Sequence, residues 1–126
     1  MTDYLNSKIA TFEQALKTFK EALLENPSEL ERDGAIQRFE YCFDLAWKTL
    51  KQFLEKRGLF DLNSPRSVYS AAYSEGIIDD EVIWSTIILK RNASVHTYNQ
   101  LLAATLFAEL PLYYYAMYNL LQKLKE

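Results

Sequence analysis

Apolar residues recur at the spacing of an α-helix along almost the whole of this chain. In the first segment the spacings alternate between four and three residues, at Leu5, Ile9, Phe12, Leu16, Phe19 and Leu23. Such a pattern places the side chains on one face of a helix. Only 3 glycines and 3 prolines interrupt the 126 residues. The sequence therefore predicts an all-α protein.

Local signals set the bounds of the first two helices. We expect the first helix to run from about Asp3 to Leu24 and to end before Asn26-Pro27. Ser28-Glu29-Leu30-Glu31 has the pattern of a capping box and predicts the start of a second, long helix. Gly58, which follows Lys56-Arg57, supplies its C-terminal stop.

Three further helices are predicted after Gly58. Ser64-Pro65 combines an N-cap with a proline at the first helical position and begins a short helix that ends near Gly76. Asp79 or Asp80 caps the next helix. The last helix contains Pro111, which should kink or split it.

Together these elements predict an antiparallel four-helix up-and-down bundle with an additional short helix, in a single domain of residues 1–126. The hydrophobic content of 49% suffices for a real core. We expect Cys42 to be a buried core residue, because Phe39, Phe43 and Ala46 surround it in the sequence.

Composition excludes several classes of protein. A net charge of -3 is unlike that of a general nucleic-acid-binding protein, so any RNA contact requires a local basic patch or a basic partner. One cysteine and one histidine exclude an internal disulfide and a structural zinc site, and no metal or other cofactor is expected. Without a membrane-length apolar run or a signal-peptide pattern, we expect a soluble, cytoplasmic protein.

The segment Arg91–Tyr98 holds the only histidine of the chain, together with an arginine and a tyrosine. Arg91 extends the apolar face that carries Trp84 and Ile88, so its guanidinium should reach the bundle edge or a partner. Bidentate recognition of phosphate is the particular strength of arginine at such a place. The alternative is a structural ion pair with an acidic residue of a helix.

His96 would lie roughly 140° around an uninterrupted helix from Arg91, too far for both to reach one substrate atom. Thr97-Tyr98-Asn99-Gln100 resembles a capping box, so we expect a turn between Asn92 and His96 and a helix that starts after Thr97. Free backbone N–H groups there would favour a phosphate and a neutral His96 that can accept a proton. Otherwise His96 is a surface or capping residue, and Tyr98 is either exposed or half-buried.

The pattern R-x4-H-x-Y resembles the active motif of the HEPN superfamily. Phe39–Lys51 resembles the second-helix signature of one branch, the nucleotidyltransferase substrate-binding proteins, and Ser64-Pro65-Arg66 also matches. The three blocks occur in the expected order, and the likeness extends over about residues 5 to 122. Ala93 and Val95 are apolar where polar residues often stand, which leaves the arginine and histidine intact.

The resemblance implies a role for each residue of the motif. Arg91 and His96 would cut RNA without a metal, and Asn92 would be auxiliary. Tyr98 would receive AMP from a partner, a minimal nucleotidyltransferase, in a two-gene toxin–antitoxin system. A homodimer with a composite cleft is also implied. A single histidine per chain agrees with a shared cleft, and we expect the apolar face ending in Trp84 and Ile88 to be wider than one bundle needs.

Three functions remain open from the sequence. The chain is an RNA-cleaving toxin, a non-catalytic substrate-binding subunit of a two-component nucleotidyltransferase, or a plain helical interaction protein. It has no G-S-x5-D-x-D motif to bind metal and nucleotide, so it is not itself expected to be the nucleotidyltransferase. If the protein is a ribonuclease, either His96 acts as both base and acid, or a two-fold dimer brings the histidines of two chains into one cleft.

Overall fold

The computed structural model describes residues 2–126 and consists of α-helices joined by short connections. Among these residues there is no β-strand. The helices are α1 (Thr2–Glu21), α2 (Glu29–Lys56), α3 (Pro65–Ser74), α4 (Glu81–Ala93) and α5 (Gln100–Leu124), with a short 3-10 turn, η1 (Ser94–His96), between the last two.

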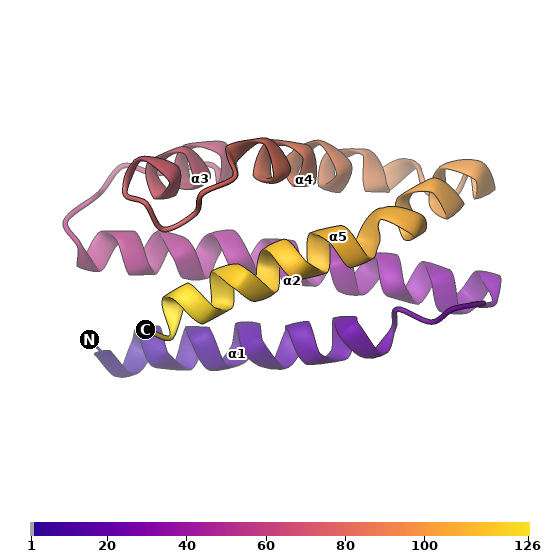
Figure 1. Cartoon of the computed structure of the whole chain (residues 1–126), viewed down its shortest axis with the longest axis horizontal. Helices are drawn as coiled ribbons and strands as arrows, with labels where there is room; N and C mark the ends of the chain where they lie inside the picture. Colours follow the sequence, from indigo (N-terminus) through magenta and orange to yellow (C-terminus); the bar gives the residue numbers. More distant parts are fainter. Residues whose placement is uncertain (1) are drawn as a thin grey trace.

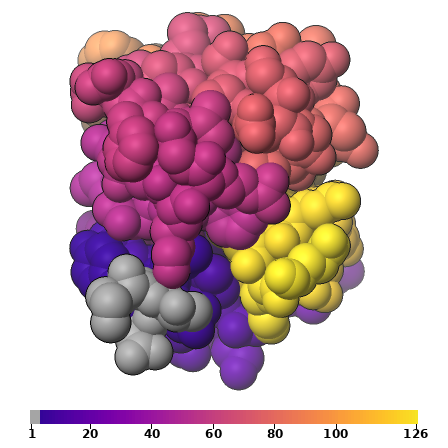
Figure 2. Space-filling model, turned by 90° about the vertical axis from the view of Figure 1, so that its left-hand side faces the viewer, coloured from indigo at the N-terminus to yellow at the C-terminus, as the bar shows by residue number. Residues whose placement is uncertain are grey.

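The helices form the predicted up-and-down bundle. In Figure 1, α1 and α4 run in one direction while α2 and α5 run in the other, and the short α3 lies on the same side of the bundle as α4. Figure 2 shows the end of the bundle where the C-terminal residues lie beside the start of α1. An ion pair of 2.8 Å between Lys125 and Glu13 joins α5 to α1. The segment that follows α4 lies at the opposite end (Figure 1).

Three of the predicted N-caps are confirmed. The Ser28 hydroxyl accepts from the Glu31 N–H while the Glu31 carboxylate accepts from the Ser28 N–H, at 3.1 and 2.8 Å. Ser64 caps α3 and Asp80 caps α4 in the same way, each accepting from the N–H three residues later. These side chains satisfy N–H groups that have no partner within the helix. Gly58, with φ of 86°, follows the end of α2 as expected.

Two helix predictions need correction. α1 ends at Glu21 and not at Leu24, and the next residues form a turn in which Leu23 still packs against the core. Of the two outcomes predicted for Pro111, a kink or a split, the split is wrong, since α5 continues through Pro111. A proline within a helix costs about 3 kcal/mol. Here Leu110 and Tyr113 are buried on the two sides of Pro111, and their packing holds the helix in one piece.

The core lies where the four long helices meet, and aromatic rings fill much of it. Phe39 packs near Phe19 of α1 and Tyr113 of α5, with ring centroids 6.2 and 5.8 Å away. Cys42 is buried as predicted, and its burial raises the pKa of the thiol to about 12, so the thiol stays protonated. Trp47 is half-buried against this core. Within residues 2–126, no helix is long and apolar enough to span a bilayer.

Candidate functional site

The chain breaks its helical path between Arg91 and His96, as the sequence predicted. α4 ends at Ala93, η1 covers Ser94–His96, and α5 begins only at Gln100. The prediction that Thr97 is the N-cap of the following helix is wrong, however. The Thr97 hydroxyl donates to the Ser94 carbonyl oxygen at 2.6 Å and caps nothing.

Asn99 is the N-cap of α5. Its side-chain oxygen accepts from the N–H groups of Leu101 and Leu102, at 3.0 and 3.2 Å. These two donors are therefore already satisfied, and the phosphate site predicted at free N–H groups beside Tyr98 loses them.

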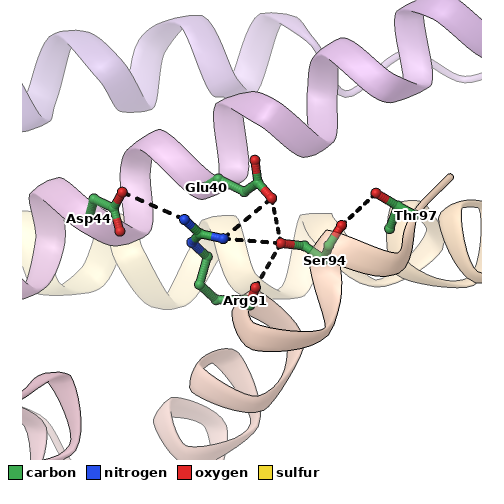
Figure 3. A network of polar contacts seen from close by, with 5 residues as sticks. All are labelled: Glu40, Asp44, Arg91, Ser94 and Thr97. Carbon is green, nitrogen blue, oxygen red and sulfur yellow. Dashed lines mark hydrogen bonds and ion pairs between the residues drawn. The ribbon is translucent and has the colours of Figure 1, made fainter.

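Arg91 lies in the last turn of α4 and reaches across to α2 (Figure 3). One guanidinium nitrogen is 3.4 Å from the Glu40 carboxylate, and the other is 3.8 Å from the Asp44 carboxylate. The Arg91 and Glu40 side chains are each 26% exposed. The structure thus favours the ion-pair alternative for Arg91 over a guanidinium presented freely to phosphate. Asp44, which would form an ordinary pair with Lys48 one helical turn away, is instead paired with α4.

Ser94 completes this network. Its hydroxyl lies 2.5 Å from the Glu40 carboxylate, to which it donates, and 2.7 Å from the carbonyl oxygen of Arg91. The same hydroxyl accepts from the Arg91 guanidinium at 3.3 Å. Ser94 is 3% exposed and its hydrogen bond to Glu40 is partly buried, so a polar contact fixes the break after α4 to α2.

A second contact fixes the far side of the segment. The Gln100 side-chain amide donates to the Glu29 carboxylate at 2.8 Å and accepts from the Arg32 guanidinium. Both partners lie in the first turn of α2. Gln100 is therefore not the reciprocal partner of Thr97 in a capping box. The residues between Ser94 and Gln100 are held at both ends against one helix.

The other motif residues are on the surface. His96 and Asn92 are exposed, and Tyr98 is 80% exposed. The rings of His96 and Tyr98 meet edge to face, with centroids 6.1 Å apart. Among the described residues, no hydrogen bond joins Arg91 to His96. The structure brings His96 and Tyr98 together and leaves Arg91 in a separate network.

Sequence reasoning missed Glu40, Asp44 and Ser94. Glu40 and Asp44 are four residues apart on α2, a spacing that places two carboxylates on one helix face. Ser94 is three residues after Arg91 and could have been read as a local partner for it. Which of the 17 acidic residues would meet Arg91 depends on tertiary packing, and no local pattern reveals it.

A groove of about 460 Å³ lies between α2 and this segment. Its polar lining comes from Asp33, Gln37 and Glu40 on α2 and from Ser94, Thr97 and Tyr98 beyond α4. Among the described residues that line it, none is a lysine or arginine. Carboxylates, hydroxyls and an amide suit a neutral or cationic ligand that carries hydrogen-bonding groups, and the carboxylates of Asp33 and Glu40 repel phosphate.

Known proteins resemble this chain over nearly its full length. The family described as "Nucleotidyltransferase substrate binding protein like" matches residues 5–126. A crystal structure of a protein from Thermus thermophilus is 42% identical, with a TM-score of 0.86, and the match covers 91% of this chain and 99% of that one.

A second solved structure shares the fold. It is a Haemophilus influenzae protein described as revealing the fold of a substrate-binding domain of a nucleotidyltransferase. The identity is 23%, the TM-score is 0.69, and all of both chains is covered. A comparison with curated proteins gives no match.

Proposed function

Because the chain belongs to the family of nucleotidyltransferase substrate-binding-like proteins, we propose that it is the substrate-binding helical subunit of a two-component nucleotidyltransferase. The observation that carries this proposal is the family match over residues 5–126, nearly the whole chain. A separate minimal nucleotidyltransferase would supply the metal and the nucleotide. The bundle would complete the cleft that holds the acceptor of the nucleotidyl group.

The groove beside η1 supports this function. The Tyr98 phenol and the Gln37 amide line it and can orient an acceptor that has hydroxyls or amines of its own. The Ser94 and Thr97 hydroxyls already donate within the chain and shape the wall of the groove. The segment is fixed to α2 at Ser94 and at Gln100. A preorganised wall of this kind loses little conformational entropy when a ligand binds.

Copurification tests the partnership. The chain should form a stable complex with a minimal nucleotidyltransferase of the same organism, detected by size-exclusion chromatography with light scattering. Adding the chain should lower the KM of the transferase for its acceptor, because the acceptor site is shared. The proposal would be wrong if no complex forms and the KM is unchanged.

A second candidate function is metal-independent RNA cleavage by a HEPN-type toxin. The break after Ala93 favours it, because it removes the helical geometry that would hold Arg91 and His96 apart. The exposure of His96 also leaves its imidazole free to meet a substrate. The carboxylates of the adjacent groove and the pairing of Arg91 weigh against it. RNA would therefore need a basic surface from the partner or from a second copy.

We expect Tyr98 to be the residue that a partner nucleotidyltransferase modifies with AMP. Its phenol is 80% exposed and lies beside His96, so an adduct would cover that imidazole. Intact mass and peptide mapping after coexpression should find one adduct, on Tyr98, and none in Tyr98→Phe. Tyr73 is 46% exposed on α3, outside the faces assigned to a partner, and serves as an internal control. An adduct on Tyr73 or another tyrosine in place of Tyr98, or none with an active transferase and ATP, would contradict the expectation.

The chain should also be a homodimer, but not for the reason that the sequence suggested. Trp84 and Ile88 are 3% and 8% exposed within one copy, so a single bundle already buries the apolar face that they share. The apolar surface that one copy leaves exposed lies instead on α5, where Leu101, Leu112 and Tyr115 are at least 59% exposed. The single charged residue from 100 to 122 is a glutamate that pairs with Lys90 of α4. A helix that is apolar on all its faces is normally buried against other protein, and here a second copy of the chain would bury the exposed face.

Leu112→Glu should convert the dimer to a monomer, because it places a carboxylate in the middle of this uncharged face. Sedimentation velocity at micromolar concentration measures the change. Phe60→Glu is the matched control, since Phe60 is 63% exposed in the connection between α2 and α3. A monomeric wild-type protein, or a Leu112→Glu variant that still dimerises, would rule out this interface.

A further inference from the structure

A long groove separates α1 from α2 on the surface of the bundle. Its volume is about 690 Å³, compared with about 460 Å³ for the groove beside η1. On the α1 side the lining residues recur at helical spacing, from Ser7 through Ala10 and Gln14 to Thr18. That stretch spans twelve residues, so its two ends lie roughly 16 Å apart at 1.5 Å rise per residue. The groove therefore follows about three turns of α1.

The α1 wall of the groove carries no charged side chain and, apart from Gln14, is made of small ones. Its polar atoms are partly satisfied within the helix, because the Thr11 hydroxyl donates to the Ser7 carbonyl oxygen and the Thr18 hydroxyl to the Ala15 carbonyl oxygen. These hydroxyls consequently need no partner from outside. Small side chains let another backbone approach closely, and the absence of charge on this wall removes a large desolvation cost.

The α2 wall has a different chemistry. Tyr41 is 48% exposed and offers an aromatic surface, and Leu45 adds an aliphatic one. Arg38 makes no ion pair within the part of the chain that the structure describes, whereas Asp44 is already engaged by Arg91. The groove is therefore mostly apolar, with the positive charge of Arg38 available at its edge.

We propose that this groove is the docking site for an amphipathic helix of the partner nucleotidyltransferase. The helix would lay its apolar face along α1 and Tyr41 and pair an acidic residue with Arg38. A trough between two helices that is open along its length suits a helix, whereas small-molecule sites enclose most of their ligand. The inference rests on the proposed partnership and specifies its surface.

The position of the groove fits this partner more closely than a second copy of the chain. Asp44 lines the groove and also contacts Arg91, so a helix bound here would adjoin the network that holds the segment after α4. The excess apolar surface suited to a second copy lies on α5 instead. Both partners could then bind one chain at once.

Ala10→Trp tests the groove directly. Ala10 is exposed, so the indole should fill the trough without disturbing the core. Calorimetric titration of the purified partner nucleotidyltransferase should show affinity at least tenfold weaker than for the wild type, with helicity by circular dichroism and dimerisation unchanged. Ser70→Trp, an equally small exposed residue on α3, should bind like the wild type.

Arg38→Glu tests the charge. It should also weaken binding at least tenfold, and Arg38→Gln should reduce the salt dependence of the affinity, because the pair with the acidic residue is lost. If the wild type binds the partner and both Ala10→Trp and Arg38→Glu bind equally well, only this inference fails. If Ala10→Trp turns a dimer into a monomer, the groove belongs to a second copy and the inference is wrong. If the wild type binds no partner, the proposed function fails with it.

Discussion

Phe43→Ala should lower the free energy of unfolding by about 3–5 kcal/mol, as expected for truncating a buried aromatic ring. Phe43 is 4% exposed, and its ring centroid is 6.3 Å from that of Tyr69. Tyr69 in turn stacks on Trp84 at 4.3 Å. These three rings connect α2 to α3 and α4. The cavity left by the substitution would therefore loosen the attachment of the short α3 and of α4 to the long helix.

Urea denaturation followed by circular dichroism measures this loss. Val82→Ala is the control, because Val82 is 76% exposed on α4 and its truncation should change stability by no more than about 0.5 kcal/mol. A loss below about 1 kcal/mol for Phe43→Ala would mean that the bundle closes around the missing ring, contrary to the close packing of these three rings.

Local chemistry explains why most of the fold could be predicted. Ser28, Ser64 and Asp80 each cap the N–H three residues later, so the pattern and its partner lie within one turn. Apolar periodicity similarly fixes which face of each helix is buried. The end of α1 was placed too late because Leu23 packs on the core from a turn, and periodicity cannot distinguish that from a helix.

The candidate site was less predictable because its contacts join distant parts of the chain. Thr97 and Asn99 can both cap a helix, and the apparent reciprocal partner Gln100 favoured Thr97. In the structure, the Gln100 side chain instead bonds to Glu29 on α2, and Asn99 takes the cap. Arg91 and Glu40 are 51 residues apart in the sequence. Only the packing of α4 beside α2 selects that pair.

His96→Ala should separate the two candidate functions. If the protein cleaves RNA, loss of its only imidazole should slow cleavage by about 10²- to 10⁴-fold, the usual contribution of a general acid or base. Stability should change by less than about 0.5 kcal/mol, because His96 is exposed. Arg91→Ala should also stop cleavage, but it removes the partner of Glu40 and should cost up to about 1 kcal/mol of stability.

The measurement is cleavage of labelled RNA with a chelator present, alongside urea denaturation of each variant. Tyr98→Phe should retain cleavage, since the phenol has no assigned role in proton transfer. Cleavage that persists in His96→Ala would exclude the mechanism in which His96 transfers the proton. Absence of cleavage by the wild type, with the acceptor KM of the partner lowered, would instead support the substrate-binding function. Arg91 would then serve to hold Ser94 and the segment after α4 against α2.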